Sequence, residues 1–242
     1  MLTAPNPFTS DPGGAARCED AGPRRQLMRR YYPDEIEADQ AVHLIGMTIG
    51  IISAPVLLVL AASSTKPAVF YSVLAYSIGL LAMLTCSAAY NLRRSSDWRD
   101  LLRRLDHVAI FVMIAGTYTP FTVCILTGWS GVWMTGSMWL AALTGVAIKL
   151  AYPRRYELGS TTVYLVMGWA VIMFMQPLVV ALDRPILVLL LSGGVLYTIG
   201  ACVHHWDRLP FHNAIWHSLV LGAAGLHYAA IVYGIVLPAS AS

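Results

Sequence analysis

The fold class is decided by an apolar stretch near the C-terminus, where residues 210–228 read PFHNAIWHSLVLGAAGLHY. Residues 214–237 contain no Lys, Arg, Asp or Glu. A helix of this length can cross the hydrocarbon core of a bilayer, which is roughly 30 Å thick. The quoted stretch nevertheless carries three histidines, His212, His217 and His227. Because polar groups in hydrocarbon are costly unless they are paired, these imidazoles predict polar partners inside a helix bundle.

Six other stretches are of similar length and free of charged residues: 41–62, 68–90, 108–127, 129–148, 162–182 and 185–203. The whole chain of 242 residues is 57% hydrophobic and only 12% charged, with a mean hydropathy of +0.62, which is far from the composition of soluble domains. The apolar runs are continuous and do not alternate, so helices are favoured over a β-barrel. We therefore predict an all-α fold, a seven-transmembrane helix bundle over residues 34–240.

Basic residues predict the orientation of this bundle. Of the 16 Lys and Arg residues, 14 fall in the N-terminal segment and in the connections after the second, fourth and sixth spans. Only Lys66 and Arg184 fall on the other side. The positive-inside rule then places the N-terminus in the cytoplasm and the C-terminus outside, in the cell's inner (plasma) membrane. Residues 1–33, which contain no apolar segment like that of a signal peptide, are expected to form a disordered cytoplasmic tail.

Charge and cysteine content narrow the expected partners. The net charge of +3 comes with no aromatic residues interleaved among the basic ones, which argues against nucleic acid. Membrane lipids are the expected partners, together with a lipid-like small molecule, and the sequence leaves the oligomeric state open. The four cysteines show no paired spacing, and we predict that all are free thiols: Cys18, Cys86, Cys124 and Cys202.

The predicted topology gathers polar residues in one layer beneath the cytoplasmic surface. Five helices contribute to it: Glu35, Glu37, Asp39, His43, Ser87, Asn91, Asp106, His107, His204, His205, His212, Asn213 and His217. His227 follows His217 by ten residues and is therefore about 15 Å deeper.

Helical spacing indicates which members of the layer share a face. Pairs four residues apart point the same way: Asp39 and His43, Ser87 and Asn91, and Asn213 and His217. His212 lies about 140° around the helix from His217, so the two cannot both face inward within one helix. We predict that His217 faces a polar cavity built from the second, third and seventh helices.

Each polar residue also has a purely structural interpretation. The functional one is favoured for His217 and Asp106, because both enter an apolar run beside compatible polar neighbours. Histidines at helix ends are commonly satisfied by water or headgroups, and this interpretation is favoured for His107, His204, His205 and His212. His43 is either a ligand or a partner of Asp39. An interhelical hydrogen bond is favoured for His227.

Two segments carry a resemblance to a known family: LRRLDHVAIFVMIAGTYTPF (102–121) and WDRLPFHNAIWHSLVLGAAGLHY (206–228). From about residue 35 to 236 the chain resembles the hemolysin III family, the bacterial branch of the progestin and adipoQ (adiponectin) receptor superfamily. The resemblance implies seven helices and a zinc ion. One histidine in Ser-x-x-x-His at the end of helix two and two in His-x-x-x-His at the start of helix seven would hold the zinc, and an aspartate opening helix three would hold its water.

By this resemblance Ser87 and Asp106 match the catalytic positions, and His217 matches the second histidine of the helix-seven pair. Asn91 and Asn213 stand at the other two metal positions, and Asp39 stands where an asparagine is usual. An amide oxygen is a weak zinc ligand, so we expect most of the zinc affinity to be lost. Other histidines of the layer offer replacements, although helix phase argues against His212.

Several functions are compatible with these residues. The first is a metal-dependent hydrolase of membrane lipid amides or esters, with Asp106 as general base. The second is a non-catalytic membrane-homeostasis or sensor protein with a degenerate zinc site and a hydrogen-bonded network in place of the metal. A cytolysin, the third, is disfavoured because the sequence has no signal peptide. Ion or proton transport would have only His227 at mid-membrane depth. The sequence leaves open whether the protein is an enzyme.

Overall fold

The computed structural model describes residues 32–93, 97–126, 128–152 and 157–240. The predicted disordered tail, residues 1–33, lies outside the described residues except for its last two, and Pro33 already begins the first helix. The remainder of the chain from Tyr32 onward forms one compact unit.

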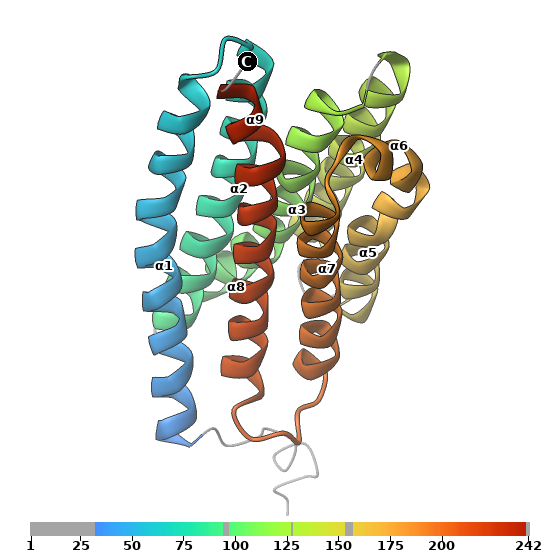
Figure 1. Ribbon diagram of the computed structural model, residues 1–242. Coiled ribbons are helices and arrows are strands. Elements are labelled where there is room, and N and C mark those ends of the chain that lie inside the picture. The colour runs from blue at the N-terminus through green and yellow to red at the C-terminus, as the bar shows by residue number, and fades with distance from the viewer. Residues whose placement is uncertain (1–31, 94–96, 127, 153–156, 241–242) are drawn as a thin grey trace, which may run out of the picture. The chain divides into compact units, whose positions relative to one another are not determined.

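Every regular element among the described residues is helical (Figure 1). In chain order they are α1 (Pro33–Ala62), α2 (Pro67–Leu92), α3 (Arg99–Cys124), α4 (Gly128–Ala151), α5 (Glu157–Trp169), η2 (Ala170–Phe174), α6 (Met175–Ala181), α7 (Arg184–His204), α8 (His212–Ile231), η3 (Val232–Val236) and α9 (Leu237–Ser240). Six helices in the described ranges are long and apolar enough to cross a membrane, and a bent pair of helices makes a seventh if its two parts are counted as one span. The predicted all-α membrane bundle is confirmed, while its orientation stays a prediction.

The bent pair corresponds to the predicted span 162–182. Its two parts, Gly159–Met173 and Met175–Ala181, meet at an angle of 59°. Pro177 lacks the N–H that would bond to the carbonyl four residues earlier, which favours a break at this point. The hydroxyl of Tyr118 donates to the carbonyls of Met167 and Gly168, at 2.9 and 2.8 Å. Polar backbone groups exposed by the break are thus satisfied from α3, as an apolar environment requires.

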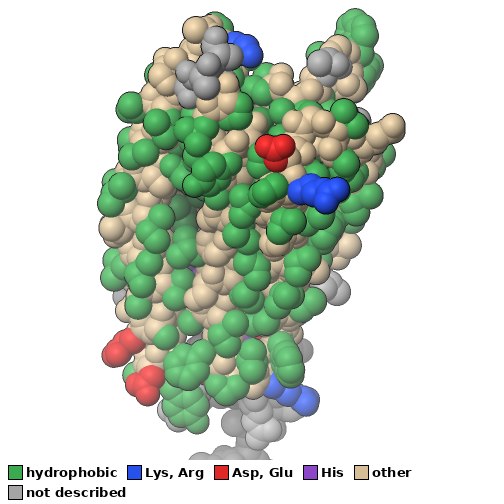
Figure 2. All heavy atoms as spheres, viewed as in Figure 1, with side chains coloured by type: hydrophobic (Ala, Val, Ile, Leu, Met, Phe, Trp, Pro, Cys, Tyr) green, Lys and Arg blue, Asp and Glu red, His purple; other side chains and the backbone are tan. Residues whose placement is uncertain are grey.

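The outer surface of the bundle is hydrophobic. Large apolar side chains on α1 are more than half exposed, among them Ile51, Ile52 and Val59. Figure 2 shows hydrophobic side chains over most of one face, with charged side chains near its two ends and also within its upper half. A surface of this kind fits lipid and not water, so the chain is a multi-pass membrane protein.

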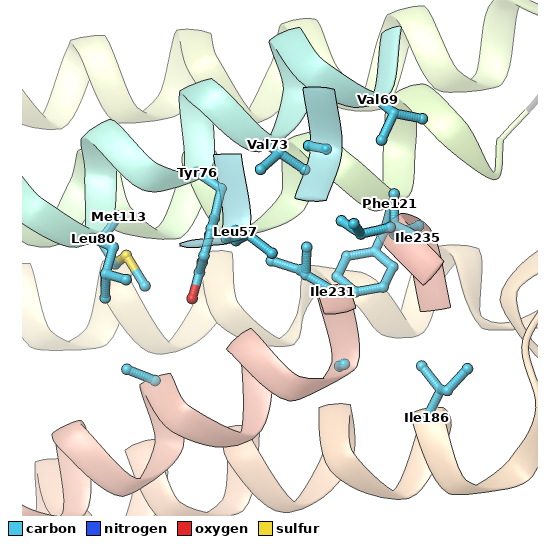
Figure 3. Packing of buried hydrophobic residues seen from close by; sticks show 14 of the residues in the cluster. Leu57, Val69, Val73, Tyr76, Leu80, Met113, Phe121, Ile186, Ile231 and Ile235 are labelled. Carbon is cyan, nitrogen blue, oxygen red and sulfur yellow. The ribbon is translucent and has the colours of Figure 1, made fainter. Parts of the chain in front are cut away.

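The hydrophobic core contains residues of α1, α2 and α8 packed together. Leu57 of α1, Tyr76 of α2 and Ile231 of α8 are fully buried in one cluster (Figure 3). Along α8, hydrogen bonds also link to α1, including one from the Tyr228 hydroxyl to the Ser53 carbonyl at 3.0 Å. Figure 1 shows α1 and α8 side by side, with α9 at the end of the bundle opposite to the start of α1.

Glycines bring α2 and α3 close together. A Cβ atom at Gly79 would lie 3.1 Å from the backbone of α3, and one at Gly116 would lie 3.0 Å from the backbone of α2. The two helices are antiparallel, and Gly79 faces Met113. Eight residues onward along α2 and seven back along α3 bring Ser87 beside Asp106. The glycine contact therefore positions two residues of the predicted polar layer.

Candidate functional site

The polar layer lies at the end of the bundle where α1, α3 and α8 begin and α2 ends. Its centre is Asp39, which is 1% exposed although it carries a carboxylate. The Nδ1 atom of His217 lies 2.6 Å from Asp39 Oδ1. A carboxylate accepts hydrogen bonds, so His217 donates through Nδ1 and keeps a lone pair on Nε2. This contact joins α1 to α8.

His43 is the second imidazole of the site, and it is also buried. Its Nδ1 atom lies 2.7 Å from the backbone carbonyl of Asp39 and 3.8 Å from Asp39 Oδ1. Because the carbonyl only accepts, Nδ1 carries the proton and Nε2 is the acceptor. The rings of His43 and His217 meet edge to face, with centroids 4.3 Å apart. The open choice between ligand and Asp39 partner is thus not exclusive: His43 is held by Asp39 and also lies beside His217.

Asn91 and Ser87 cover the far side of His43. The Asn91 side-chain nitrogen lies 3.1 Å from His43 Nε2 and 3.0 Å from the Ser87 carbonyl, and it donates to both. The Ser87 hydroxyl donates to the carboxylate of Asp106, and its oxygen lies 3.2 Å from His43 Nε2. Asp106 is in turn within electrostatic reach of His217 and Asp39. The structure therefore brings these predicted residues of α2 and α3 into one site.

Glu35 fixes the start of α8 relative to α1. Its buried carboxylate accepts a hydrogen bond from the backbone N–H of Phe211, with Oε1 3.0 Å from the nitrogen. Phe211 has a φ of +58°, a left-handed conformation that is unfavourable for a large side chain. The contact holds the residue that precedes α8 and so sets the position from which His217 reaches Asp39.

The remaining histidines of the layer lie around this centre. His212 begins α8 and is buried, and its Nε2 atom lies 4.0 Å from Asp207 in the connection before α8. The His204 ring packs against His205 and Trp216, with centroids 5.2 Å away in both cases. The backbone carbonyl of His107 accepts a hydrogen bond from Tyr164. None of these four histidines belongs to the group of potential metal ligands in the described chain.

His227 lies apart from the polar layer, as predicted. Its Nε2 atom lies 3.2 Å from the carbonyl of Leu190 on α7, so the predicted interhelical hydrogen bond is confirmed. It lines an apolar pocket of about 70 Å³ between α3, α7, α8 and the bent span. No residue of the polar layer lines this pocket.

Sequence reasoning missed the central role of α1. It placed Asp39 and His43 in the layer but assigned the cavity at His217 to helices two, three and seven, whereas the direct partner of His217 is Asp39. Spacing within one helix says nothing about which helices are neighbours. The available signal was the pair of Asp39 and His43, four residues apart at the entrance to an apolar run.

Comparisons with known proteins agree with this architecture. Residues 39–228 match the family model described as "Haemolysin-III related". The chain belongs to the hemolysin III family. It is 35% identical to the hemolysin-3 homolog of Bacillus subtilis (strain 168), over 83% of this chain and 95% of that protein. It is 33% identical to hemolysin-3 of Bacillus cereus, over 88% of this chain and 97% of that protein.

A more distant relative is human monocyte to macrophage differentiation factor, which is 30% identical over 64% of this chain and 67% of that protein. No solved structure matches the chain significantly.

The zinc positions implied by resemblance to hemolysin III proteins do not fit zinc in this chain. At the helix-two position Asn91 presents an amide N–H to His43, and a metal ion needs a lone pair there. At the helix-seven position Asn213 also carries an amide, whose oxygen is a weak zinc ligand. Of the three implied ligands, only His217 retains an imidazole.

A different set of residues can hold a metal ion. Asp39, His43 and His217 each offer a ligand atom, and these atoms lie within 4.8 Å of one another. The first two are buried, and the His217 side chain is 17% exposed. Within the described ranges this is the one such group of three.

Proposed function

We propose that this hemolysin III protein is a hydrolase of membrane lipid amides or esters, with Asp106 as its general base. One observation carries the proposal: beside the buried side chains of Asp39 and His43, the Asp106 carboxylate is hydrogen-bonded to Ser87 and lies within electrostatic reach of the His217 imidazole. A carboxylate near an imidazole and a hydroxyl is a recurrent arrangement for proton transfer to or from an attacking water.

The depth of the site supports a lipid substrate. Asp39, Asp106 and His217 are the seventh, eighth and sixth residues of α1, α3 and α8. At 1.5 Å per residue they lie about 8 to 11 Å inside the ends of their helices. Ester and amide linkages of lipids lie at the boundary between headgroups and hydrocarbon, which is a comparable depth. With these helix ends at the membrane surface, a lipid carbonyl reaches this layer without leaving the membrane.

In the proposed reaction Asp106 accepts the proton of a water molecule that attacks the lipid carbonyl. The Ser87 hydroxyl orients the carboxylate through its hydrogen bond. The carbonyl carbon gains the water oxygen, its bond to the amine or alcohol breaks, and Asp106 returns the proton to that leaving group, which gives a fatty acid and an amine or an alcohol. No step is assigned to zinc at the family positions, because Asn91 and Asn213 do not fit that ion.

The test is turnover by the purified full-length protein in detergent or nanodiscs. Ceramide and phospholipid are supplied separately, and released fatty acid is measured by mass spectrometry. Wild type is expected to release fatty acid from one of them, and Asp106→Asn is expected to lower the rate at least about 100-fold. Asp100→Asn, an exposed carboxylate on the same helix, is the matched control and should leave the rate unchanged. Absence of release by wild type, or full activity of Asp106→Asn, would contradict the proposal.

A second candidate, a non-catalytic sensor or membrane-homeostasis protein, is favoured by the Asn91 contact. The Asn91 amide donates to His43 and to the Ser87 carbonyl, so these hydrogen bonds are formed between protein groups without a metal ion. This candidate predicts that Asn91→Ala alters cellular function while Asp106→Asn preserves it. The test is complementation of a deletion strain with each variant. Normal function of Asn91→Ala together with loss of function in Asp106→Asn would contradict this candidate.

A further inference from the structure

We infer that this protein binds one divalent transition-metal ion between α1 and α8, through Asp39, His43 and His217. This site shares His217 with the positions that the family resemblance implies, and Asp39 and His43 of α1 take the place of Asn91 and Asn213. The inference rests on the proposed function in one respect only, the role of the ion as the electrophile that polarises a lipid carbonyl. Binding itself is independent of turnover and can be measured without it.

The two separations that involve Asp39 Oδ1 require only small adjustments for metal binding. Both histidines turn Nδ1 toward Asp39 Oδ1, His217 at 2.6 Å and His43 at 3.8 Å. Ligand atoms about 2 Å from a tetrahedral ion are about 3.3 Å from one another. One separation must therefore widen and the other shorten by roughly 0.5 to 0.7 Å. The ligand atoms of the two histidines lie within 4.8 Å of each other and must come to about the same separation.

The donor types select the ion. Two imidazoles and one carboxylate suit zinc and its late first-row neighbours, whereas magnesium and calcium prefer oxygen ligands alone. Three protein ligands also leave one coordination position open, as in catalytic zinc sites and unlike closed structural ones. The site thus matches an ion that could contact water or a carbonyl oxygen.

The charges of the site also favour a dication. Asp39 and Asp106 are in electrostatic contact with each other inside a largely apolar bundle, and each carries a negative charge when ionised. Two carboxylates at such a site repel, and burial makes their charges costly. A doubly charged cation balances both of them. The differences from the family pattern also favour a cation here. This chain has asparagine in place of two family histidines, and at position 39 it has a carboxylate in place of the usual asparagine.

Metal binding has a consequence for Asn91. An imidazole bound through Nδ1 keeps its proton on Nε2, whereas His43 and His217 both donate through Nδ1 here, so both must change tautomer. Asn91 now donates to His43 Nε2 and must turn its amide by 180° to offer oxygen instead. His43 must also give up its hydrogen bond to the Asp39 carbonyl. Asn91 therefore competes with the metal ion and is not one of its ligands.

The experiment measures metal binding by the full-length protein purified in detergent and stripped with chelator. Zinc is titrated calorimetrically, and cobalt(II) is followed by its visible absorption. One ion per chain is expected, with magnesium failing to bind. Asp39→Asn, which keeps the size of the side chain, and His217→Ala are each expected to weaken zinc binding at least about 10-fold. His43→Ala is expected to do the same.

Three controls separate this site from its alternatives. His227→Ala removes a buried histidine from the same helix as His217 and should leave the zinc affinity within about 2-fold, a change of about 0.4 kcal/mol. Asn91→Ala and Asn213→Ala, at the family positions, should not weaken binding more than about 3-fold. Thermal unfolding of every variant shows that it is folded. If an alanine variant does not fold, the size-matched His43→Gln and His217→Gln replace it.

The outcomes are distinguishable from those of the hydrolase test. Zinc binding that is lost with Asp39→Asn but not with Asn91→Ala supports the α1–α8 site, whether or not any lipid is cleaved. Absence of binding by wild type, or loss with Asn213→Ala and not with Asp39→Asn, overturns it. Turnover without metal binding would leave the hydrolase standing and remove only this inference.

Discussion

His217 and His227 lie ten residues apart on α8, and their imidazoles have different kinds of partners. His217 donates to a buried carboxylate and lies against a second imidazole. His227 contacts the backbone carbonyl of Leu190 and lines an apolar pocket. Residue type alone therefore does not distinguish a potential ligand from a structural hydrogen bond in a membrane helix.

The difference lies in what the neighbouring helices bring. Around His217, α1 supplies a carboxylate and an imidazole, and α2 supplies an amide and a hydroxyl. Around His227, α7 supplies a glycine, Gly193, against which the ring packs. The first region contains groups that can be ionised and can exchange partners, and the second has a fixed geometry. We expect substitutions in the first region to affect ligand binding and those in the second to affect only stability.

The largest expected effect follows from removing Asp39. Asp39→Ala leaves the Nδ1 proton of His217 and the side chain of His43 without their carboxylate in a buried site. We expect the free energy of unfolding to fall by about 3 kcal/mol. Titration with SDS in mixed micelles measures this quantity.

A double-mutant cycle sharpens the comparison. Asp39→Ala and His217→Ala should show a coupling of at least about 1 kcal/mol, because the two side chains are in direct contact. Asp39→Ala and His227→Ala should add within about 0.5 kcal/mol. Equal coupling in the two pairs would mean that the two regions are not separate.

Gly193→Ala is the next largest effect and acts on the His227 region. A Cβ atom there would lie 2.5 Å from Nε2 of His227, the atom that contacts Leu190. Either the ring or α7 must shift, and we expect a loss of about 2 kcal/mol. Gly225→Ala, on the same helix as His227 and with nothing within 4 Å, is the control and should change stability by less than about 0.5 kcal/mol. A tolerated Gly193→Ala would show that the His227 region is adaptable and not fixed.

Glu35→Ala tests whether the start of α8 depends on α1. The substitution removes the acceptor of the Phe211 N–H while that residue holds its left-handed conformation. We expect a loss of about 1.5 kcal/mol in unfolding free energy. We also expect weaker zinc binding, because His217 lies in the second turn of α8. Glu37→Ala, an exposed carboxylate two residues away, is the matched control. A loss of stability with unchanged zinc affinity would show that the contact between Glu35 and Phe211 does not position the metal site.

Much of the fold follows from the lengths of the apolar runs. Residues 68–90 predict α2 (Pro67–Leu92) closely, and residues 185–203 predict α7 (Arg184–His204). The break in the fifth span was only partly predictable. Pro177 signals a kink, but the position of the 3₁₀ turn over Ala170–Phe174 depends on Tyr118, which reaches it from a distant helix.

The site likewise has features that follow from spacing within a helix and contacts that depend on which helices are neighbours. Residues that share a helix face were predictable, and so was the gathering of Ser87 and Asp106 at one end of the bundle. The bond between Asp39 and His217 was not, because it depends on α1 lying beside α8, and no spacing within either helix encodes that neighbourhood. The family's metal positions did not predict the site correctly. Asn91 stands at one of them, and its side-chain N–H donates to His43.

The smallest predicted effect, from Tyr118→Phe, sharpens the comparison from the side of His227. Tyr118 lines the same pocket as His227, and its hydroxyl bonds to two carbonyls and to the N–H of Val171 at the break of the fifth span. Hydrogen bonds within membrane proteins contribute modestly, so the expected loss of unfolding free energy is about 1 kcal/mol. Tyr233→Phe, whose side chain is 59% exposed, should cost nothing measurable. Because the pocket and the polar layer share no residue, Tyr118→Phe should leave zinc affinity within about 2-fold, and a larger change would mean that the bent span communicates with the site through α3.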